Sequence, residues 1–319
     1  MNTSNSKIIA TIASVLITLA IVGSVILSLL PSQNQTQSND IETQSAEASI
    51  STPLPVEVVT FLSTGAQAIA NQDYQGAVVA YSDVIELLPD YAVAYSQRSV
   101  AYKELGYYGK ALNDISTAIE LNGNSNELLR QRADILVLSE NYAGAVDDYT
   151  TAIELDPADL QAYNNRSIAY IRLGETEKAM ADIEHVLSVI PDQANAYYNR
   201  ALIYEDLNKF EDALEDYTKA IELSSDDTGN IYARRGLVYA RIGESSEALA
   251  DFEQALDKGM ESEVIYNVRG LIYSELGQLE QALSDYSKAI SINPQNPAIY
   301  YNRGVAYINL QEYDLAAID

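Results

Sequence analysis

The chain has 319 residues and a formal net charge of −27, because 46 acidic residues face 19 basic ones. That balance argues against a nucleic-acid partner and against docking on anionic lipid headgroups, since both need clustered Lys and Arg. The sequence contains no cysteine and a single histidine, His185, so it offers neither thiol chemistry nor the usual nucleophile–base pairs. We therefore expect a protein that is not an enzyme and that holds no cofactor or metal ion.

Residues 8–30 form an uninterrupted apolar run that carries no charge. At about 1.5 Å per residue, a helix of this length reaches roughly 35 Å and can cross the hydrocarbon core of a bilayer. Lys7 flanks the run, so the positive-inside tendency predicts that residues 1–7 stay in the cytoplasm and that the rest lies outside it. A cleaved signal peptide is the alternative, but its apolar core is usually shorter and its cleavage site nearer. We predict an uncleaved, single-pass transmembrane anchor in a cell membrane.

Residues 31–57 differ sharply in composition from the apolar run. They are rich in Ser, Gln, Thr and Asn, contain three prolines and show no periodicity. This composition is typical of a flexible polar linker, whose ends would lie roughly 30 Å apart on average. The linker would keep the remaining residues near the membrane without laying them on it.

From residue 58 onward the sequence repeats with a period of 34 residues. In 92–125, one stripe at helical spacing runs from Tyr95 to Tyr102, and a second runs from Ala111 to Leu121, with a glycine between them. One alanine marks the second stripe of every period: Ala77, Ala111, Ala145, Ala179, Ala213, Ala248, Ala282 and Ala316. A period of this length indicates a solenoid of repeated two-helix units.

The repeated positions resemble those of the tetratricopeptide repeat family. The shared pattern is an aromatic residue at position 4, a small residue at 8, Tyr or Leu at 11, Gly near 15, Ala at 20 and 27, an aromatic near 24 and Pro at 32. The repeats occupy 58–91, 92–125, 126–159, 160–193, 194–227, 229–262, 263–296 and 297–319. The resemblance implies an all-α fold, a right-handed superhelix of helix–turn–helix repeats, preceded here by the transmembrane helix. The repeat at 297–319 stops inside its second helix, so we expect the chain to be incomplete at this end.

Arginine at position 7 and aspartate at position 23 accompany each other through the repeats. The arginines are Arg98, Arg132, Arg166, Arg200, Arg235, Arg269 and Arg303, and the aspartates are Asp114, Asp148, Asp182, Asp216, Asp251, Asp285 and Asp319. The first repeat has Thr64 and Ala80 and lacks both, so we predict an ion pair inside each repeat rather than between neighbours. A ligand-binding role for these arginines is the alternative. The pairs occupy seven of the basic residues, which leaves an acidic surface that favours a basic or neutral protein partner. Acidity that only keeps the chain in solution is the alternative.

The family resemblance also implies a binding surface. In that family the first helices line a concave groove, and positions 2, 5, 6, 9, 12 and 13 tend to face it. These positions are rich in amides here, and an amide row can bind an extended peptide backbone because it both donates and accepts. The candidate contacts are Gln97, Gln131, Asn164, Asn165, Asn195, Tyr198, Asn199, Asn230, Arg234, Asn267, Tyr301 and Asn302. Merely solvated surface amides are the alternative. Position 9 is mostly apolar and holds no asparagine, so the family's carboxylate clamp is absent.

We therefore predict a membrane-tethered scaffold of a bacterial cell, with its repeats outside the cytoplasm, that binds a segment of another protein in its groove. A narrower version is a cell-envelope assembly or secretion factor. A different class is the substrate-docking arm of an enzyme whose catalytic domain lies beyond residue 319. Self-association through the last repeat is a further alternative.

Overall fold

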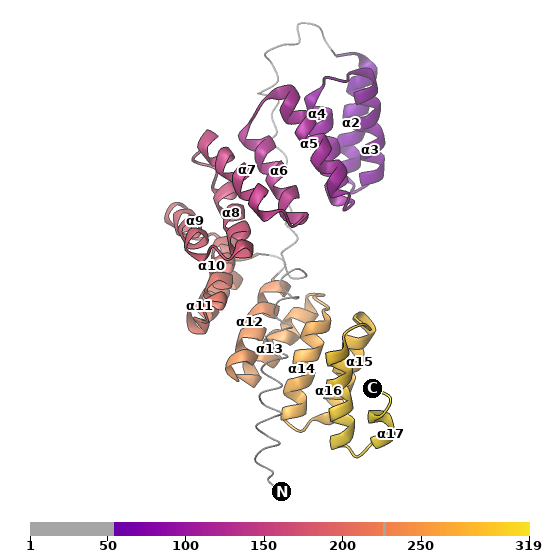
Figure 1. Ribbon diagram of the computed structural model, residues 1–319, viewed down its shortest axis with the longest axis vertical. Helices are drawn as coiled ribbons and strands as arrows, with labels where there is room; N and C mark the ends of the chain where they lie inside the picture. Colours follow the sequence, from indigo (N-terminus) through magenta and orange to yellow (C-terminus); the bar gives the residue numbers. More distant parts are fainter. Residues whose placement is uncertain (1–53, 226–227) are drawn as a thin grey trace. The chain divides into compact units, whose positions relative to one another are not determined.

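The computed structural model describes residues 54–225 and 228–319 (Figure 1). The predicted cytoplasmic N-terminus, the transmembrane anchor and all but the end of the linker lie outside the described residues. Within the described part of the chain, no helix combines the length and the apolar character that a membrane span needs.

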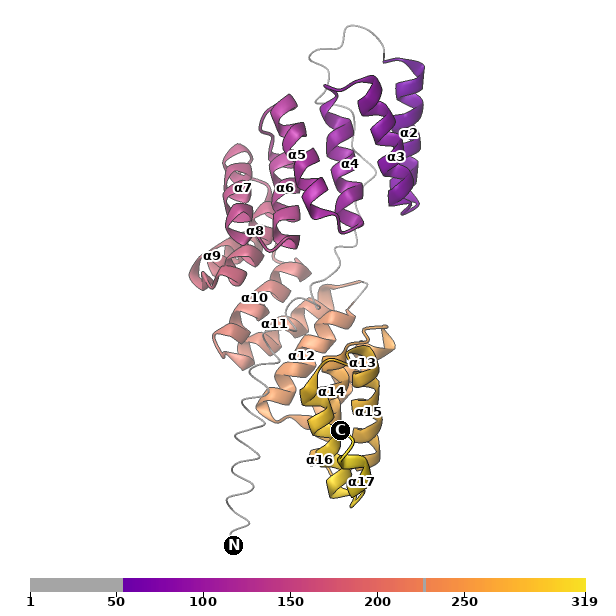
Figure 2. The same ribbon diagram turned by 45° about the vertical axis from the view of Figure 1, so that its right-hand side comes forward.

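The described residues are helical, and consecutive helices pack as antiparallel pairs (Figures 1 and 2). The chain divides between Asn199 and Arg200 into two compact units, called here the N-terminal block (54–199) and the C-terminal block (200–319). The N-terminal block contains α2 (Val56–Ala70), α3 (Tyr74–Leu87), α4 (Ala92–Glu104), α5 (Tyr108–Asn122), α6 (Asn126–Leu138), α7 (Tyr142–Leu155), α8 (Leu160–Leu173) and α9 (Thr176–Val189). The division falls within α10 (Ala194–Asp206). The C-terminal block continues with α11 (Phe210–Leu223), α12 (Gly229–Ile242), α13 (Ser245–Asp257), α14 (Glu263–Glu275), α15 (Leu279–Ile292), α16 (Pro297–Asn309) and α17 (Tyr313–Ala316).

The turn inside each helix pair has the same backbone conformation throughout. Position 15 adopts a positive φ between 55° and 88° in every repeat, at Gln72, Gly106, Glu140, Gly174, Asn208, Gly243, Gly277 and Gln311. Only glycine takes this conformation without steric cost. Because the turn recurs at the same position, the second helix of every repeat returns antiparallel to the first.

The core of each block is built from small residues of one helix facing aromatic rings of the next. The position 20 alanines from Ala77 to Ala282 are fully buried. The ring at position 24 lies on the small residue at position 8: a Cβ on Gly236 would come within 2.9 Å of Phe252, and one on Gly270 within 2.8 Å of Tyr286. Since real side chains do not approach this closely, any larger residue at these glycines would displace the ring.

The predicted arginine–aspartate pairs are confirmed, and each lies within one repeat. The arginine Nε donates to the aspartate Oδ2 at 2.6 to 2.8 Å in all seven. The Nη2 atom donates to Oδ1 of the same carboxylate, at 2.8 Å for Arg166 and Asp182. This two-pronged geometry ties the first helix of each repeat to the second. In several repeats Nη1 also reaches a hydroxyl of the preceding repeat, as from Arg98 to Ser82 at 2.9 Å.

Candidate functional site: the inner face of the first helices

In each block the first helices of successive repeats lie next to one another. The helices α6 and α8 touch in the N-terminal block, and α12, α14 and α16 touch in sequence in the C-terminal block (Figure 2). We call the surface that carries positions 2, 5, 6, 9, 12 and 13 of these helices the inner face. It is the surface on which the twelve candidate contacts were predicted.

The structure places these twelve residues at very different depths. Asn195 and Tyr301 are exposed, and Gln97 and Gln131 are half-buried. The other eight are buried: Asn164, Asn165, Tyr198, Asn199, Asn230, Arg234, Asn267 and Asn302. The amide row therefore lies mostly beneath the surface. A role for these residues in binding a partner remains a prediction, and it now depends mainly on the four that solvent can reach.

The buried amides bond to one another across repeats. Asn199 Nδ2 donates to Asn164 Oδ1 at 3.0 Å, and Asn302 Nδ2 donates to Asn267 Oδ1 at the same distance. In both cases position 6 reaches back to position 5 of the preceding repeat. Gln131 takes the same place and accepts a hydrogen bond from the Ser96 hydroxyl at 3.0 Å. These contacts, called here the inner-face links, satisfy polar groups that would otherwise be costly to bury.

One link in the N-terminal block contains a carboxylate. Asp134, at position 9, accepts hydrogen bonds on Oδ1 from the Tyr149 hydroxyl at 2.5 Å and from Asn165 Nδ2 at 3.0 Å. Burial raises the pKa of Asp134 above its ordinary value, although these two donors and the nearby Arg130 counteract the rise. Burial likewise raises the pKa of Tyr149. The link joins α6, α7 and α8 through a single oxygen atom.

A second carboxylate occupies a comparable place in the C-terminal block. Glu205, at position 12, accepts a hydrogen bond from the Tyr217 hydroxyl. Burial raises the pKa of Glu205, and the charge of Arg234 is the largest influence in the opposite direction. Arg234 stands at position 6, where five other repeats have an amide. An ionic attraction thus replaces the amide link between these two repeats.

Three family models match the chain. A TPR repeat model covers residues 133–174 and 270–311, and a tetratricopeptide repeat model covers 194–227. A further tetratricopeptide repeat model covers 92–125, 160–193 and 229–257. The chain is a tetratricopeptide repeat protein. The resemblance that the repeat positions indicated is confirmed over most of the second to eighth repeats.

The curated relatives match only short stretches of this tetratricopeptide repeat protein. Human serine/threonine-protein phosphatase 5 is 47% identical over 51 residues, which are 16% of this chain and 10% of the phosphatase. The small glutamine-rich tetratricopeptide repeat-containing protein 2 of Saccharomyces cerevisiae is 36% identical over 58 residues, 18% of this chain and 17% of that protein. The matched stretch thus spans less than a fifth of either relative.

Solved structures share the fold over much longer stretches. A tetratricopeptide repeat protein from Parabacteroides merdae ATCC 43184 superimposes with a TM-score of 0.64 at 18% identity, over 78% of this chain and 98% of that one. A chain of the APC/C hetero-tetramer Cut9–Hcn1 gives 0.67 at 15% identity, over 80% of this chain and 49% of that one. PilW, a type IV pilus biogenesis factor, gives 0.60 at 18% identity, over 67% and 99%. At these identities the likeness establishes the all-α repeat solenoid alone.

Between the links, the inner face of the tetratricopeptide repeats is apolar. Position 9 carries Val100 and Ile168 in the N-terminal block and Leu202, Leu237 and Leu271 in the C-terminal block, all partly exposed. We call these side chains the apolar floor. Unlike the amides, they have no polar groups to satisfy, so a partner that covers them gains from their removal from water.

The spacing of the polar residues in the sequence indicates the inner-face links, although the number of amides does not. The bonded residues are separated by 35 positions, as in Ser96–Gln131, Asn164–Asn199 and Asn267–Asn302. A polar residue at position 5 is thus followed by an amide at position 6 of the next repeat. Pairing of this kind distinguishes a structural link from a free row of amides.

The described residues offer no metal site, since they contain no group of three or more His, Cys, Asp or Glu arranged to hold an ion. His185 is exposed and its ring lies 4.4 Å from that of Tyr163. That contact is a surface stacking interaction between α9 and α8.

Proposed function

We propose that this tetratricopeptide repeat protein is a membrane-tethered scaffold whose inner face binds a segment of another protein. The apolar floor is the observation that carries the proposal. Within each block its side chains occupy the same position of neighbouring first helices, which offers an extended or helical segment repeated contacts. The exposed Asn195 and Tyr301 add polar groups at the edge of this surface.

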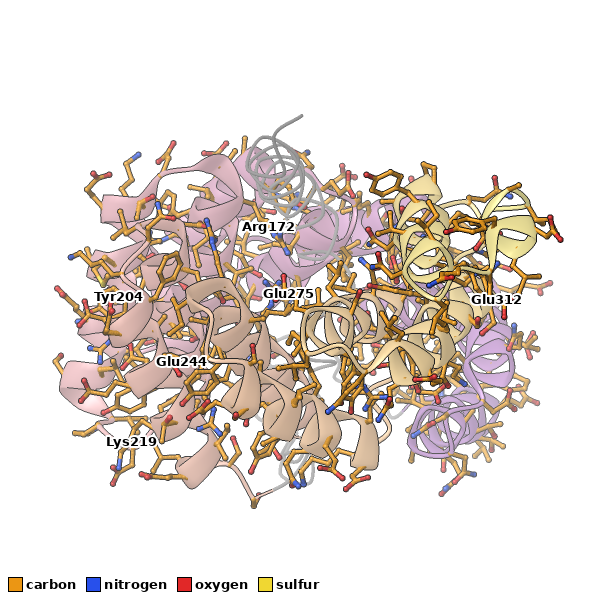
Figure 3. The ribbon with its side chains drawn as sticks, turned by 90° about the horizontal axis from the view of Figure 1, so that it is seen from below. Arg172, Tyr204, Lys219, Glu244, Glu275 and Glu312 are labelled. Carbon is orange, nitrogen blue, oxygen red and sulfur yellow. The ribbon has the colours of Figure 1, made fainter. Side chains whose placement is uncertain are left out.

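The charge of the chain favours a basic partner segment. Exposed acidic side chains, among them Glu244, Glu275 and Glu312 (Figure 3), lie at or just beyond the C-terminal ends of the first helices in the C-terminal block. The seven arginines of the Arg–Asp pairs are neutralised within the fold and do not offset these charges. Complementary charge accelerates encounter and is screened by salt. We propose that the protein has no catalytic activity and binds neither a cofactor nor a nucleic acid.

The membrane tether rests on the sequence of residues 8–30. We propose that this run anchors the chain in a cell membrane and that the repeats project outside the cytoplasm. The full-length protein should then stay with the membrane fraction in alkaline carbonate, and added protease should degrade the repeats of intact spheroplasts. Release of the full-length chain by carbonate would remove the tether from the proposal while leaving the inner face as a binding surface.

Site-specific photo-crosslinking tests the inner face directly. A photoreactive residue at Val100 or Val305, both at position 9, should crosslink to a partner polypeptide in cells. The same residue at Leu155, at the end of α7, provides the control, because its side chain is exposed but lies away from the inner face. Equal crosslinking from Leu155 would contradict a role for the inner face.

A docking arm of a longer enzyme is the second candidate. The match to a short stretch of serine/threonine-protein phosphatase 5 favours it, because there the similar residues form a small part of a much longer chain. A stop codon directly after Asp319 in the reading frame would eliminate this candidate. An envelope assembly factor is a narrower form of the scaffold and would be identified by the partner that crosslinks.

A further inference from the structure

Six of the seven paired arginines are covered by tyrosine rings. The Arg98 guanidinium lies 5.7 Å from the ring centres of both Tyr95 and Tyr102. Arg166 lies 5.4 Å from Tyr163 and 5.6 Å from Tyr170. The remaining four, Arg200, Arg235, Arg269 and Arg303, each have at least one such ring within 5.9 Å. The rings come from positions 4 and 11, one turn on either side of the arginine.

Arg132 is the exception. Its repeat has Leu129 at position 4 and Leu136 at position 11, so no ring covers the guanidinium. The Arg132 side chain is accordingly 29% exposed, against 18% for Arg98 and 13% for Arg166. Its Nε and Nη2 atoms bond to Asp148. In the flanking repeats Nη1 donates to a hydroxyl, from Arg98 to Ser82 and from Arg166 to Thr150, whereas Arg132 makes no such bond.

An open hollow of about 360 Å³ lies beside this guanidinium, between α5, α6 and α7. Its apolar lining comes from Leu112 and Leu136, and its polar lining from Ser116, Asp147 and the Arg132–Asp148 pair. We call it the Arg132 hollow. It is found in the repeat that lacks both tyrosines, and its lining includes Leu136, whose position 11 carries a tyrosine beside the arginine in the flanking repeats.

We propose that the Arg132 hollow binds an aromatic side chain, Tyr or Phe, presented by a partner polypeptide. The protein itself shows the chemistry, since the same guanidinium–carboxylate pair stacks against a tyrosine ring in the repeats on either side. A planar cation held by a carboxylate offers its face to a π-system. Leu112 and Leu136 supply apolar contact for the ring edge, and Ser116 and Asp147 can accept a hydrogen bond from a tyrosine hydroxyl.

The aromatic side chain must come from outside the described structure. Residues 1–53 contain no Phe, Trp or Tyr, so the preceding segment of this chain cannot supply it. The hollow is also separate from the inner face, because its residues come from positions 7, 11, 19, 22, 23 and from positions 21 and 25 of the preceding repeat. The proposal therefore does not rest on the proposed function, and failure of one leaves the other standing.

Leu136→Tyr is the variant that tests the proposal. Tyr occupies position 11 in six other repeats, so the substitution should fold and place its own ring over Arg132. Leu155→Tyr is the matched control, since it makes the same chemical change at an exposed site that does not line the hollow. The probes are N-acetyl-tyrosinamide, N-acetyl-phenylalaninamide and N-acetyl-leucinamide, added to the full-length protein in detergent micelles. Binding is followed through the NMR signals of the labelled Leu112 methyl groups.

We expect the two aromatic amides to shift the Leu112 signals with half-saturation on the order of 10 mM, as suits one stacked ring. The leucine amide should bind at least about fivefold more weakly. Leu136→Tyr should abolish the shifts, and Leu155→Tyr should retain them. Equal binding of the leucine amide, or shifts that persist in Leu136→Tyr, would overturn the proposal, as would no shift at any concentration. A self-association that Leu136→Tyr alone abolishes in sedimentation would assign the hollow to a second copy and would also overturn it.

Discussion

Repeats 126–159 and 160–193 are adjacent in the N-terminal block, share one backbone design and differ at the positions that matter most. Both contain the Arg–Asp pair, as Arg132–Asp148 and Arg166–Asp182. In 160–193 the arginine is covered by two tyrosines and position 9 is apolar. In 126–159 the covering residues are leucines, position 9 is the carboxylate of Asp134 and the turn has Glu140 in place of glycine.

The comparison separates what the repeat needs from what it tolerates. The Arg–Asp pair persists with and without its aromatic cover, so the cover is not needed for the pair to form. The cover, the apolar position 9 and the turn glycine each improve a repeat without being indispensable. Repeat 126–159 lacks all three, and it contains both the Arg132 hollow and the Asp134 carboxylate. In this repeat the departures from the pattern thus coincide with the proposed ring-binding hollow and with a carboxylate whose pKa is raised.

The largest expected effect comes from breaking the better-covered pair. Arg166→Met leaves the Asp182 carboxylate, whose side chain is 8% exposed, without its cation and should cost about 3 kcal/mol of unfolding free energy. Arg132→Met should cost less, because the Arg132 side chain is 29% exposed. Urea denaturation followed by circular dichroism measures both. Lys178→Met removes a cation that is 63% exposed and should leave the stability nearly unchanged, because solvent screens an exposed ion pair. Equal losses of unfolding free energy in Arg166→Met and Arg132→Met would show that the tyrosine cover does not strengthen the Arg–Asp pair.

Exchanging the cover between the two repeats should have the next largest effect. Tyr170→Leu removes a ring that lies 5.6 Å from Arg166 and 5.3 Å from Lys178, and should cost roughly 1–2 kcal/mol. The reverse change, Leu136→Tyr, should stabilise by roughly 0.5–1 kcal/mol because it fills the Arg132 hollow. Hydrogen exchange of α6 to α9 would locate the changes. Destabilisation by Leu136→Tyr would mean that the hollow cannot accept a ring.

The partly buried carboxylate of Asp134 predicts a pH-dependent difference. Burial raises the pKa of Asp134 in the fold above its unfolded value, so its favourable contribution is present below about pH 4 and is lost as the pH rises through the folded value. Asp134→Asn keeps Oδ1 as the acceptor for Tyr149 and Asn165. It should stabilise the protein by about 1 kcal/mol at neutral pH, with the gain disappearing near pH 4. Urea denaturation at several pH values measures it.

The control for this pH effect is Asp147→Asn. Asp147 lies in the same repeat but is exposed, so its substitution should leave the stability nearly unchanged at every pH. A gain from Asp134→Asn that did not vary with pH would contradict the role assigned to the buried charge.

The sequence predicted features that recur at one spacing, and it missed those that join two repeats. The Arg–Asp pairs were predictable because both residues are missing together in the first repeat, which has Thr64 and Ala80 at these positions. The inner-face amides were predictable as a row, but their burial depends on how closely α8 approaches its neighbours, and no single repeat encodes that distance. Leu129, at position 4 of its repeat, indicates no site by itself. Its consequence depends on Leu136 and on the hollow beside Arg132, which only the structure shows.

The smallest expected effect concerns the turn between the two helices. Glu140 adopts a φ of 61°, whereas Gly174 adopts 73° at the same position of the next repeat. A side chain in this left-handed region costs roughly 1 kcal/mol, so Glu140→Gly should raise the melting temperature by about 2 °C. Glu140→Ala is the control, because it removes the same charge but keeps a Cβ in the strained conformation. An equal rise from Glu140→Ala would assign the gain to charge repulsion among the acidic residues and not to the backbone, and the turn would then cease to distinguish the two repeats.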